Sequence, residues 1–133
     1  RDHFDIMSVH AYGWKFPPDD AADGQRINFS RAVLTRQVME RNGDGDKPVF
    51  ITEGGWNDHP RWTKAVRPAQ RVQYTVRAYQ KAAEEWPWCE VVAMWCFRLP
   101  ALTHTYNDYF TFVNFDFKPK PVYDAVRAYA IGQ

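Results

Sequence analysis

The chain has 133 residues, and its 17 basic and 16 acidic side chains give a formal net charge of +1. This balance gives no support to binding of nucleic acid or of an anionic membrane surface, and no apolar run is long enough to span a bilayer. The length suits one domain with a sizeable core. Aromatic residues make up 17% of the chain, and several fall in predicted loops, where core packing is a weaker explanation.

The first strand signal covers residues 4–12. Alternation places His10 and Tyr12 on one face and Val9 on the other. The two polar residues therefore share a face at the end of the strand. A lone histidine is more often a structural residue with its hydrogen bonds satisfied. The pair therefore indicates a functional site only if other strands end in polar residues at the same edge.

A long loop, residues 13–28, is followed by a predicted helix from Ser30, a good capping residue, to about Asn42. Gly43 then provides a natural stop for the helix. The expected buried stripe of this helix consists of Val33, Leu34, Val38 and Met39.

The turn after this helix contains Asn42, Asp44 and Asp46, which invites comparison with the calcium-binding loop of an EF-hand. Counted from Asn42, Glu53 falls at position 12, as such a loop requires. Position 6 must be glycine for the sharp turn, but here it is Lys47, and a strand follows in place of a second helix. The sequence therefore predicts a plain turn without a metal site, and it calls for no cofactor.

The second strand, residues 48–53, is an uncharged run of β-branched and aromatic residues that starts at a proline and ends in Glu53. Alternation places Val49, Ile51 and Glu53 on one face. A carboxylate that ends an apolar strand is costly to bury unless it is used. For one isolated glutamate, a salt bridge or a helix cap is the simpler explanation.

Two more helices are predicted, 68–86 and 122–130, around a third strand at 90–97. This strand places Trp95 on one face together with Val91 and Ala93. The inward positions expected of the two helices are Ala69, Val72, Val76, Tyr79 and Ala83, and then Val122, Ala125, Val126 and Tyr129.

The two cysteines, Cys89 and Cys96, lie on or beside the third strand. An extended chain separates them by roughly 23 Å, far beyond the reach of a disulfide. Both are therefore predicted to be free thiols that pack as small apolar groups. They say little about the compartment, and a secreted location stays open.

The order strand–helix, repeated three times, predicts an α/β fold of three consecutive parallel strands with crossover helices. All long loops follow strands, and in βα-barrels the chemistry lies at that edge. We interpret residues 1–133 as a single domain, part of a (β/α)8 barrel.

At this point the strand ends resemble those of clan A glycoside hydrolases, the (β/α)8 enzymes that include families 5 and 39. His-Ala-Tyr at 10–12 is similar to the end of their sixth strand, Ile-Thr-Glu-Gly-Gly-Trp at 51–56 to the nucleophile end of the seventh, and Ala-Met-Trp-Cys-Phe-Arg at 93–98 to the eighth. Residues 118–126 also resemble the start of the final helix. The resemblance implies that the chain forms the last three βα units, the C-terminal part of a TIM barrel.

The resemblance implies a retaining glycoside hydrolase that acts on β-linked oligosaccharides or polysaccharides. Glu53 would attack the anomeric carbon and form a glycosyl-enzyme intermediate. Tyr12 would hold this carboxylate ionised and aimed, His10 would lie near the sugar or the acid/base, and Trp95 would offer its face to the sugar. Candidates for further sugar contacts are Trp14, Trp56, Asn57, Arg98 and the aromatic residues between 106 and 117.

The second catalytic group has no counterpart in the sequence. Clan A enzymes take their acid/base from an Asn-Glu pair on the fourth strand, which this chain does not contain, and nothing marks Asp58 or Asp108 as an acid. Three strands alone would also leave apolar sheet edges unpaired. We therefore expect the missing strands from another segment or another copy, a homo-oligomer included. The alternative is a non-catalytic remnant that binds glycan or assembles with other chains. A third possibility, a phosphate-binding barrel half, is less favoured because the rim lacks a glycine-rich phosphate loop.

Overall fold

Three parallel strands form one open sheet in the computed structural model, which describes residues 3–132. The strands β1 (Met7–Tyr12), β2 (Val49–Gly55) and β3 (Cys89–Val92) lie side by side in that order. The helices α1 (Ala32–Arg41), α2 (Pro68–Glu85) and α3 (Pro121–Ala130) follow the strands in turn, with short 3₁₀ helices η1 (Phe29–Arg31) and η2 (Tyr106–Tyr109). The predicted α/β fold of three consecutive parallel βα units is confirmed.

The third strand is shorter than the sequence predicts. Regular pairing ends at Val92, not at residue 97. The chain nevertheless continues along β2, because the N–H of Ala93 donates to the Ile51 carbonyl at 2.7 Å and the N–H of Trp95 donates to the Gly54 carbonyl at 2.9 Å. Trp95 therefore still reaches the carboxyl end of the sheet.

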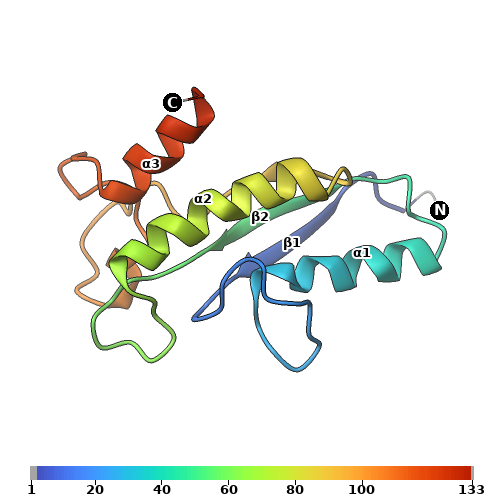
Figure 1. Cartoon of the computed structure of the whole chain (residues 1–133), viewed down its shortest axis with the longest axis horizontal. Helices are drawn as coiled ribbons and strands as arrows, with labels where there is room; N and C mark the ends of the chain where they lie inside the picture. The colour runs from blue at the N-terminus through green and yellow to red at the C-terminus, as the bar shows by residue number, and fades with distance from the viewer. Residues whose placement is uncertain (1–2, 133) are drawn as a thin grey trace.

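One face of the sheet is packed against α1 and α2, which lie along the length of the strands in Figure 1. Val49 and Ile51 of β2 are completely buried on this face. Burial of such side chains supplies most of the favourable free energy of folding. The core cluster of buried residues comprises Ala11, Phe29, Ala32, Ile51, Trp56, Val66, Ala78, Ala82 and Trp86.

The buried side of α2 differs from the predicted stripe. Proline at the first helical position and the Gln70 side chain, which accepts a hydrogen bond from the N–H of Arg67 at 3.0 Å, fix the start of the helix as expected. The fully buried residues, however, are Arg71, Thr75, Ala78 and Ala82. The prediction assumed that all apolar side chains of α2 face the sheet, whereas some of them face α3. Ala69 and Val72 line a cavity together with Pro121 and Val122 of α3.

The first helix also departs in part from its expected stripe. Met39 is buried as predicted, but Val38 is 48% exposed. After α1 the chain turns through Gly43, whose φ of 80° favours glycine, and Lys47 pairs with Asp44 at 3.0 Å. None of the helices within residues 3–132 is both long and apolar enough to cross a membrane.

Candidate active site

The strands β1 and β2 change register shortly before their carboxyl ends. Val9 pairs with Ile51, whereas the next residue, His10, pairs with Glu53. Thr52 is therefore an extra residue in β2, as in a β-bulge. Strict alternation put Glu53 on the same face as Ile51, and that prediction is wrong because the extra residue reverses the alternation beyond it.

This bulge brings Glu53 to the face of the sheet that the helices leave open. Ser8 Oγ lies 2.6 Å from Thr52 Oγ1 on this face. Tyr12 donates its hydroxyl hydrogen to Glu53 Oε2 at 2.9 Å, and His10 Nδ1 lies 3.5 Å from the same oxygen. The structure thus brings together the three strand-end residues that the sequence singled out.

The Glu53 side chain is 38% exposed, so the carboxylate is open to a ligand. Within the described part of the chain, both of its polar contacts reach Oε2. Burial and the hydrogen bond to Glu53 raise the pKa of Tyr12 above the ordinary value for tyrosine. Tyr12 therefore remains a protonated donor at neutral pH.

A buried aromatic ring joins this site to the segment that follows β3. The Phe110 ring packs edge-on against Trp95, with centroids 5.3 Å apart, and against Tyr12 at 5.6 Å. It also contacts Trp62, at 5.9 Å. Phe110 is one of the aromatic residues between 106 and 117 that were expected to contact sugar, but it is only 5% exposed and packs between other rings. A residue in a long loop has no periodicity that marks it as buried.

Phe110 is held in place from α2 by a buried arginine. Arg71, only 2% exposed, donates to the carbonyls of Phe110 at 2.6 Å and Thr111 at 3.0 Å. It also pairs with Asp58 at 3.2 Å. Burial lowers the pKa of Arg71, an effect that the Asp58 charge opposes. Asp58, a rim carboxylate, is therefore committed to a structural ion pair.

Two of the expected sugar-binding residues are buried. Trp56 packs against Gly13, where any Cβ would overlap the indole, and its ring N–H donates to the Phe16 carbonyl at 2.8 Å. Asn57, 1% exposed, donates to the Tyr106 carbonyl at 2.7 Å. Both side chains hold loops in place, so neither offers a surface to a sugar.

The other two expected contacts lie on the loops themselves. Trp14 follows β1 with a φ of 52°, an unusual value for a residue other than glycine, and Lys64 Nζ lies 3.5 Å from the centre of its ring. The Arg98 guanidinium packs over Phe117 at 4.4 Å and over Phe115 at 5.5 Å. Among the described residues, the polar contacts of Glu53 come from Tyr12 and His10, not from Trp14 or Arg98.

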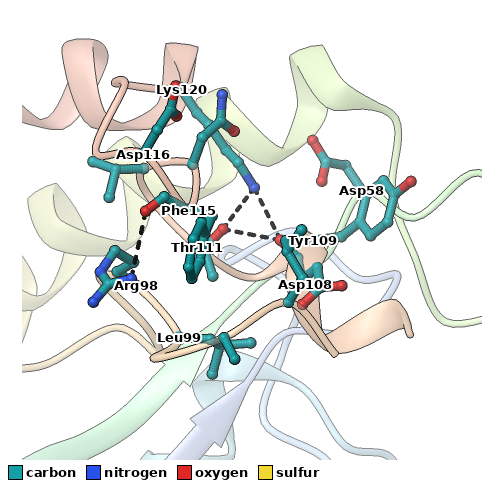
Figure 2. Close-up of a pocket in the computed structure, with 13 residues that line it drawn as sticks. Asp58, Arg98, Leu99, Asp108, Tyr109, Thr111, Phe115, Asp116 and Lys120 are labelled. Carbon is teal, nitrogen blue, oxygen red and sulfur yellow. Dashed lines mark hydrogen bonds between the residues drawn. The ribbon is translucent and has the colours of Figure 1, made fainter. Parts of the chain in front are cut away.

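A cavity of about 610 Å³ lies beside Arg98, within the long loop between β3 and α3 (Figure 2). Lys120 points into this region and donates to the Asp108 carbonyl at 2.9 Å and to Thr111 Oγ1 at 2.6 Å. The cavity is lined by Asp58 and by residues of the segment between 98 and 120, and Glu53 does not line it. We therefore do not identify it with the candidate active site.

Within residues 3–132 there is no group of three histidine, cysteine or acidic side chains arranged to hold a metal ion. Cys89 and Cys96 are free thiols, as predicted. Burial raises the pKa of both, which leaves them poor nucleophiles.

No protein-family model and no curated protein matches this sequence. Among solved structures, a family 39 glycoside hydrolase from the gut symbiont Bacteroides cellulosilyticus WH2 matches 95% of this chain with a TM-score of 0.70 and 22% identity. A GH2 β-galacturonidase from Eisenbergiella tayi matches 97% of this chain with a TM-score of 0.66 and 17% identity. A GH113 β-1,4-mannanase also matches 97% of this chain, with a TM-score of 0.56 and 16% identity.

These likenesses show a shared fold with glycoside hydrolases. The chain spans only part of each relative: 26% of the family 39 enzyme, 24% of the β-galacturonidase and 40% of the mannanase. In each of these solved structures, the matched segment is a minor part of the chain.

Proposed function

We propose that this chain supplies the nucleophile half of the active site of a retaining glycoside hydrolase that acts on β-linked glycans. The observation that carries the proposal is the hydrogen bond from Tyr12 to Glu53 at the carboxyl edge of a parallel sheet. Retaining hydrolysis needs one carboxylate that attacks the anomeric carbon and a second that serves as acid and then as base. Glu53 is suited to the first of these roles.

The surroundings of Glu53 fit a nucleophile. Tyr12 and His10 both approach Oε2, which leaves Oε1 to attack the anomeric carbon. Because its pKa is raised, Tyr12 stays protonated and donates to the ionised form of Glu53. Trp95, held through Phe110, offers a ring to the apolar face of the sugar.

The second carboxyl group belongs to the part of the barrel outside this chain. It has to lie roughly 5–5.5 Å from the first. Asp58 is bound to Arg71, and Asp108 accepts hydrogen bonds from the backbone N–H of Thr103 and His104. We infer that another segment of a longer protein, or another copy of this chain, supplies the acid/base together with the strands that pair with the free edges of β1 and β3.

The second candidate function is a non-catalytic remnant that binds glycan or assembles with other chains. It is favoured by the same missing carboxyl group, since a nucleophile without an acid turns over natural glycans slowly. General acid catalysis is worth about 10²–10⁴-fold. The two candidates differ in whether Glu53 forms a covalent bond to a glycan.

Covalent trapping separates the two candidates. The experiment uses this chain together with the remaining βα units of its barrel, hereafter the completed barrel, and a set of 2-deoxy-2-fluoro-β-glycosyl fluorides. Attack by Glu53 forms an ester bond to the anomeric carbon as the C–F bond breaks, and fluoride leaves without a proton. The 2-fluorine destabilises the cationic transition state and slows hydrolysis of the ester. Mass spectrometry is expected to find the added glycosyl mass on the peptide that contains Glu53.

Two variants control this experiment. Glu53→Gln is nearly isosteric and is expected to abolish both trapping and hydrolysis while the fold is retained. Glu84→Gln changes an exposed glutamate of α2 and is expected to change neither. An adduct on another carboxylate, or undiminished hydrolysis by Glu53→Gln, would overturn the proposed role of Glu53. Glycan binding without an adduct or hydrolysis in the parent protein would favour the remnant.

A further inference from the structure

Loops from two different strands meet in a stacked aromatic pair at the carboxyl edge of the sheet. Trp62, from the loop between β2 and α2, lies flat on Tyr106 at the start of η2, with ring centroids 4.7 Å apart and an interplanar angle of 9°. Although Trp62 covers one face of its ring, Tyr106 remains 41% exposed. Beside them, His59 packs edge-on against Tyr109 at 4.6 Å.

Buried polar groups fix this pair from below. The Asn57 side chain donates to the Tyr106 carbonyl at 2.7 Å and accepts from the His59 N–H at 2.8 Å, so one amide ties both loops together. Arg71 holds the Phe110 carbonyl directly after η2. An exposed ring that is held rigid loses little conformational entropy when it binds a ligand.

The pair is continuous with the candidate active site. Phe110 contacts both the Trp62 ring and the Tyr12 ring. Tyr12 in turn donates to Glu53. The aromatic pair therefore lies one ring away from the residue that holds the proposed nucleophile.

We propose that Trp62 and Tyr106 form a sugar-binding subsite next to the cleaved bond, so that the substrate is a β-linked glycan chain and not a small monoglycoside. The C–H groups of a pyranose ring form an apolar face that packs flat on an aromatic ring, and the open face of Tyr106 presents such a surface. Trp62 serves as a positioning residue that supports Tyr106 from behind. The location of this subsite rests on the proposed function, whereas its ability to bind sugar does not.

Calorimetry on the completed barrel tests the subsite without catalysis. The protein carries Glu53→Gln so that bound glycan is not cleaved, and the probes are β-1,4-linked gluco-, manno- and xylohexaose together with the corresponding monosaccharides. At least one hexaose is expected to bind more tightly than its monosaccharide. Tyr106→Ala is expected to lower the affinity for that hexaose by roughly tenfold, equal to about 1.4 kcal/mol, and to leave the affinity for the monosaccharide unchanged.

Three further variants sharpen the result. Tyr106→Phe keeps the ring and is expected to keep the affinity for the hexaose. Trp62→Ala is expected to weaken it less than Tyr106→Ala, because the contact surface stays but its support is lost. Phe97→Ala removes another exposed aromatic ring of the β3–α3 loop and is expected to have no effect.

The subsite is overturned if no hexaose binds more tightly than its monosaccharide, if Tyr106→Ala binds the hexaose as well as the parent, or if it weakens both probes equally. These results are independent of covalent trapping at Glu53. Loss of hexaose binding in Tyr106→Ala without an adduct at Glu53 would keep the subsite and reject the nucleophile. An adduct at Glu53 together with unchanged hexaose binding in Tyr106→Ala would keep the nucleophile and reject the subsite.

Discussion

The two faces of the sheet differ in what their residues do. On the face covered by α1 and α2, Val49 and Ile51 are completely buried and apolar. On the open face, Ser8, Thr52 and Glu53 form polar contacts and keep access to solvent. The same short strands therefore carry stability on one side and the candidate chemistry on the other, which means that each property can be changed separately by mutation.

Arg71 does not follow this division, because it is a buried charged residue on α2 that holds the loop beside the candidate active site. Its removal is expected to lower the free energy of unfolding more than any other change considered below. Arg71→Ala leaves the partly exposed Asp58 and the buried carbonyls of Phe110 and Thr111 without their donor. Loss of one partner from a buried ion pair costs about 3–5 kcal/mol of unfolding free energy. Urea denaturation of the completed barrel measures this loss. A cost below about 1 kcal/mol would show that the loop holds its place without this arginine.

Neighbouring residues of β2 give the most direct comparison of the two faces. Ile51→Ala removes a completely buried side chain and is expected to cost about 2–5 kcal/mol. Thr52→Ala removes an exposed hydroxyl from its contact with Ser8 and is expected to cost less than about 1 kcal/mol. Equal losses in urea denaturation would contradict the division between the faces.

Tyr12→Phe is expected to reduce activity without a comparable loss of stability. The ring still packs against Phe110, but the hydrogen bond to Glu53 is lost. A misplaced reacting group costs up to about 10²-fold in rate, so kcat is expected to fall by roughly that factor with little change in KM. Steady-state kinetics of the completed barrel, with circular dichroism to check the fold, measures the effect. A rise in KM with unchanged kcat would assign Tyr12 to substrate binding.

The smallest expected effect is on the pH dependence of stability. The pKa of Tyr12 is raised in the folded state, whereas an unfolded tyrosine titrates near about 10. Below that pH both states keep the proton, so the stabilising contribution is complete. Above it the unfolded chain ionises first, and the free energy of unfolding falls as the pH rises toward the folded-state pKa. Urea denaturation at about pH 8 and about pH 11 is expected to show a smaller alkaline loss for Tyr12→Phe than for the parent, and an equal loss would contradict the raised pKa.

Local sequence signals were enough to predict the order of elements and the start of α2. Alternation and helical periodicity identify elements that pack in one direction, and a proline marks the first turn of a helix. The grouping of His10, Tyr12 and Glu53 was also predictable, because parallel strands bring their carboxyl ends to one edge. The roles assigned to these residues stay predictions.

The remaining features depend on tertiary contacts that leave no local pattern. Arg71 resembles a solvent-facing residue of an amphipathic helix until the carbonyls of the β3–α3 loop are placed beside it. Phe110 and Trp56 are loop aromatics whose burial is decided by neighbours distant in the sequence. Thr52 could not be recognised as an extra residue, since a register shift belongs to a pair of strands and not to either sequence alone.

The register shift at Thr52 has an evolutionary consequence. Residues before the shift, such as Val49 and Ile51, are constrained by packing against the helices, whereas the orientation of Glu53 depends on which residue of β2 pairs with His10. If Thr52 paired with His10 and the register did not shift, strict alternation would continue and turn the Glu53 carboxylate toward the helices, while the buried part of the strand stays intact. A lineage of such chains can therefore gain or lose a carboxylate on the open face of its sheet through a one-residue change in strand register, without first rebuilding its core.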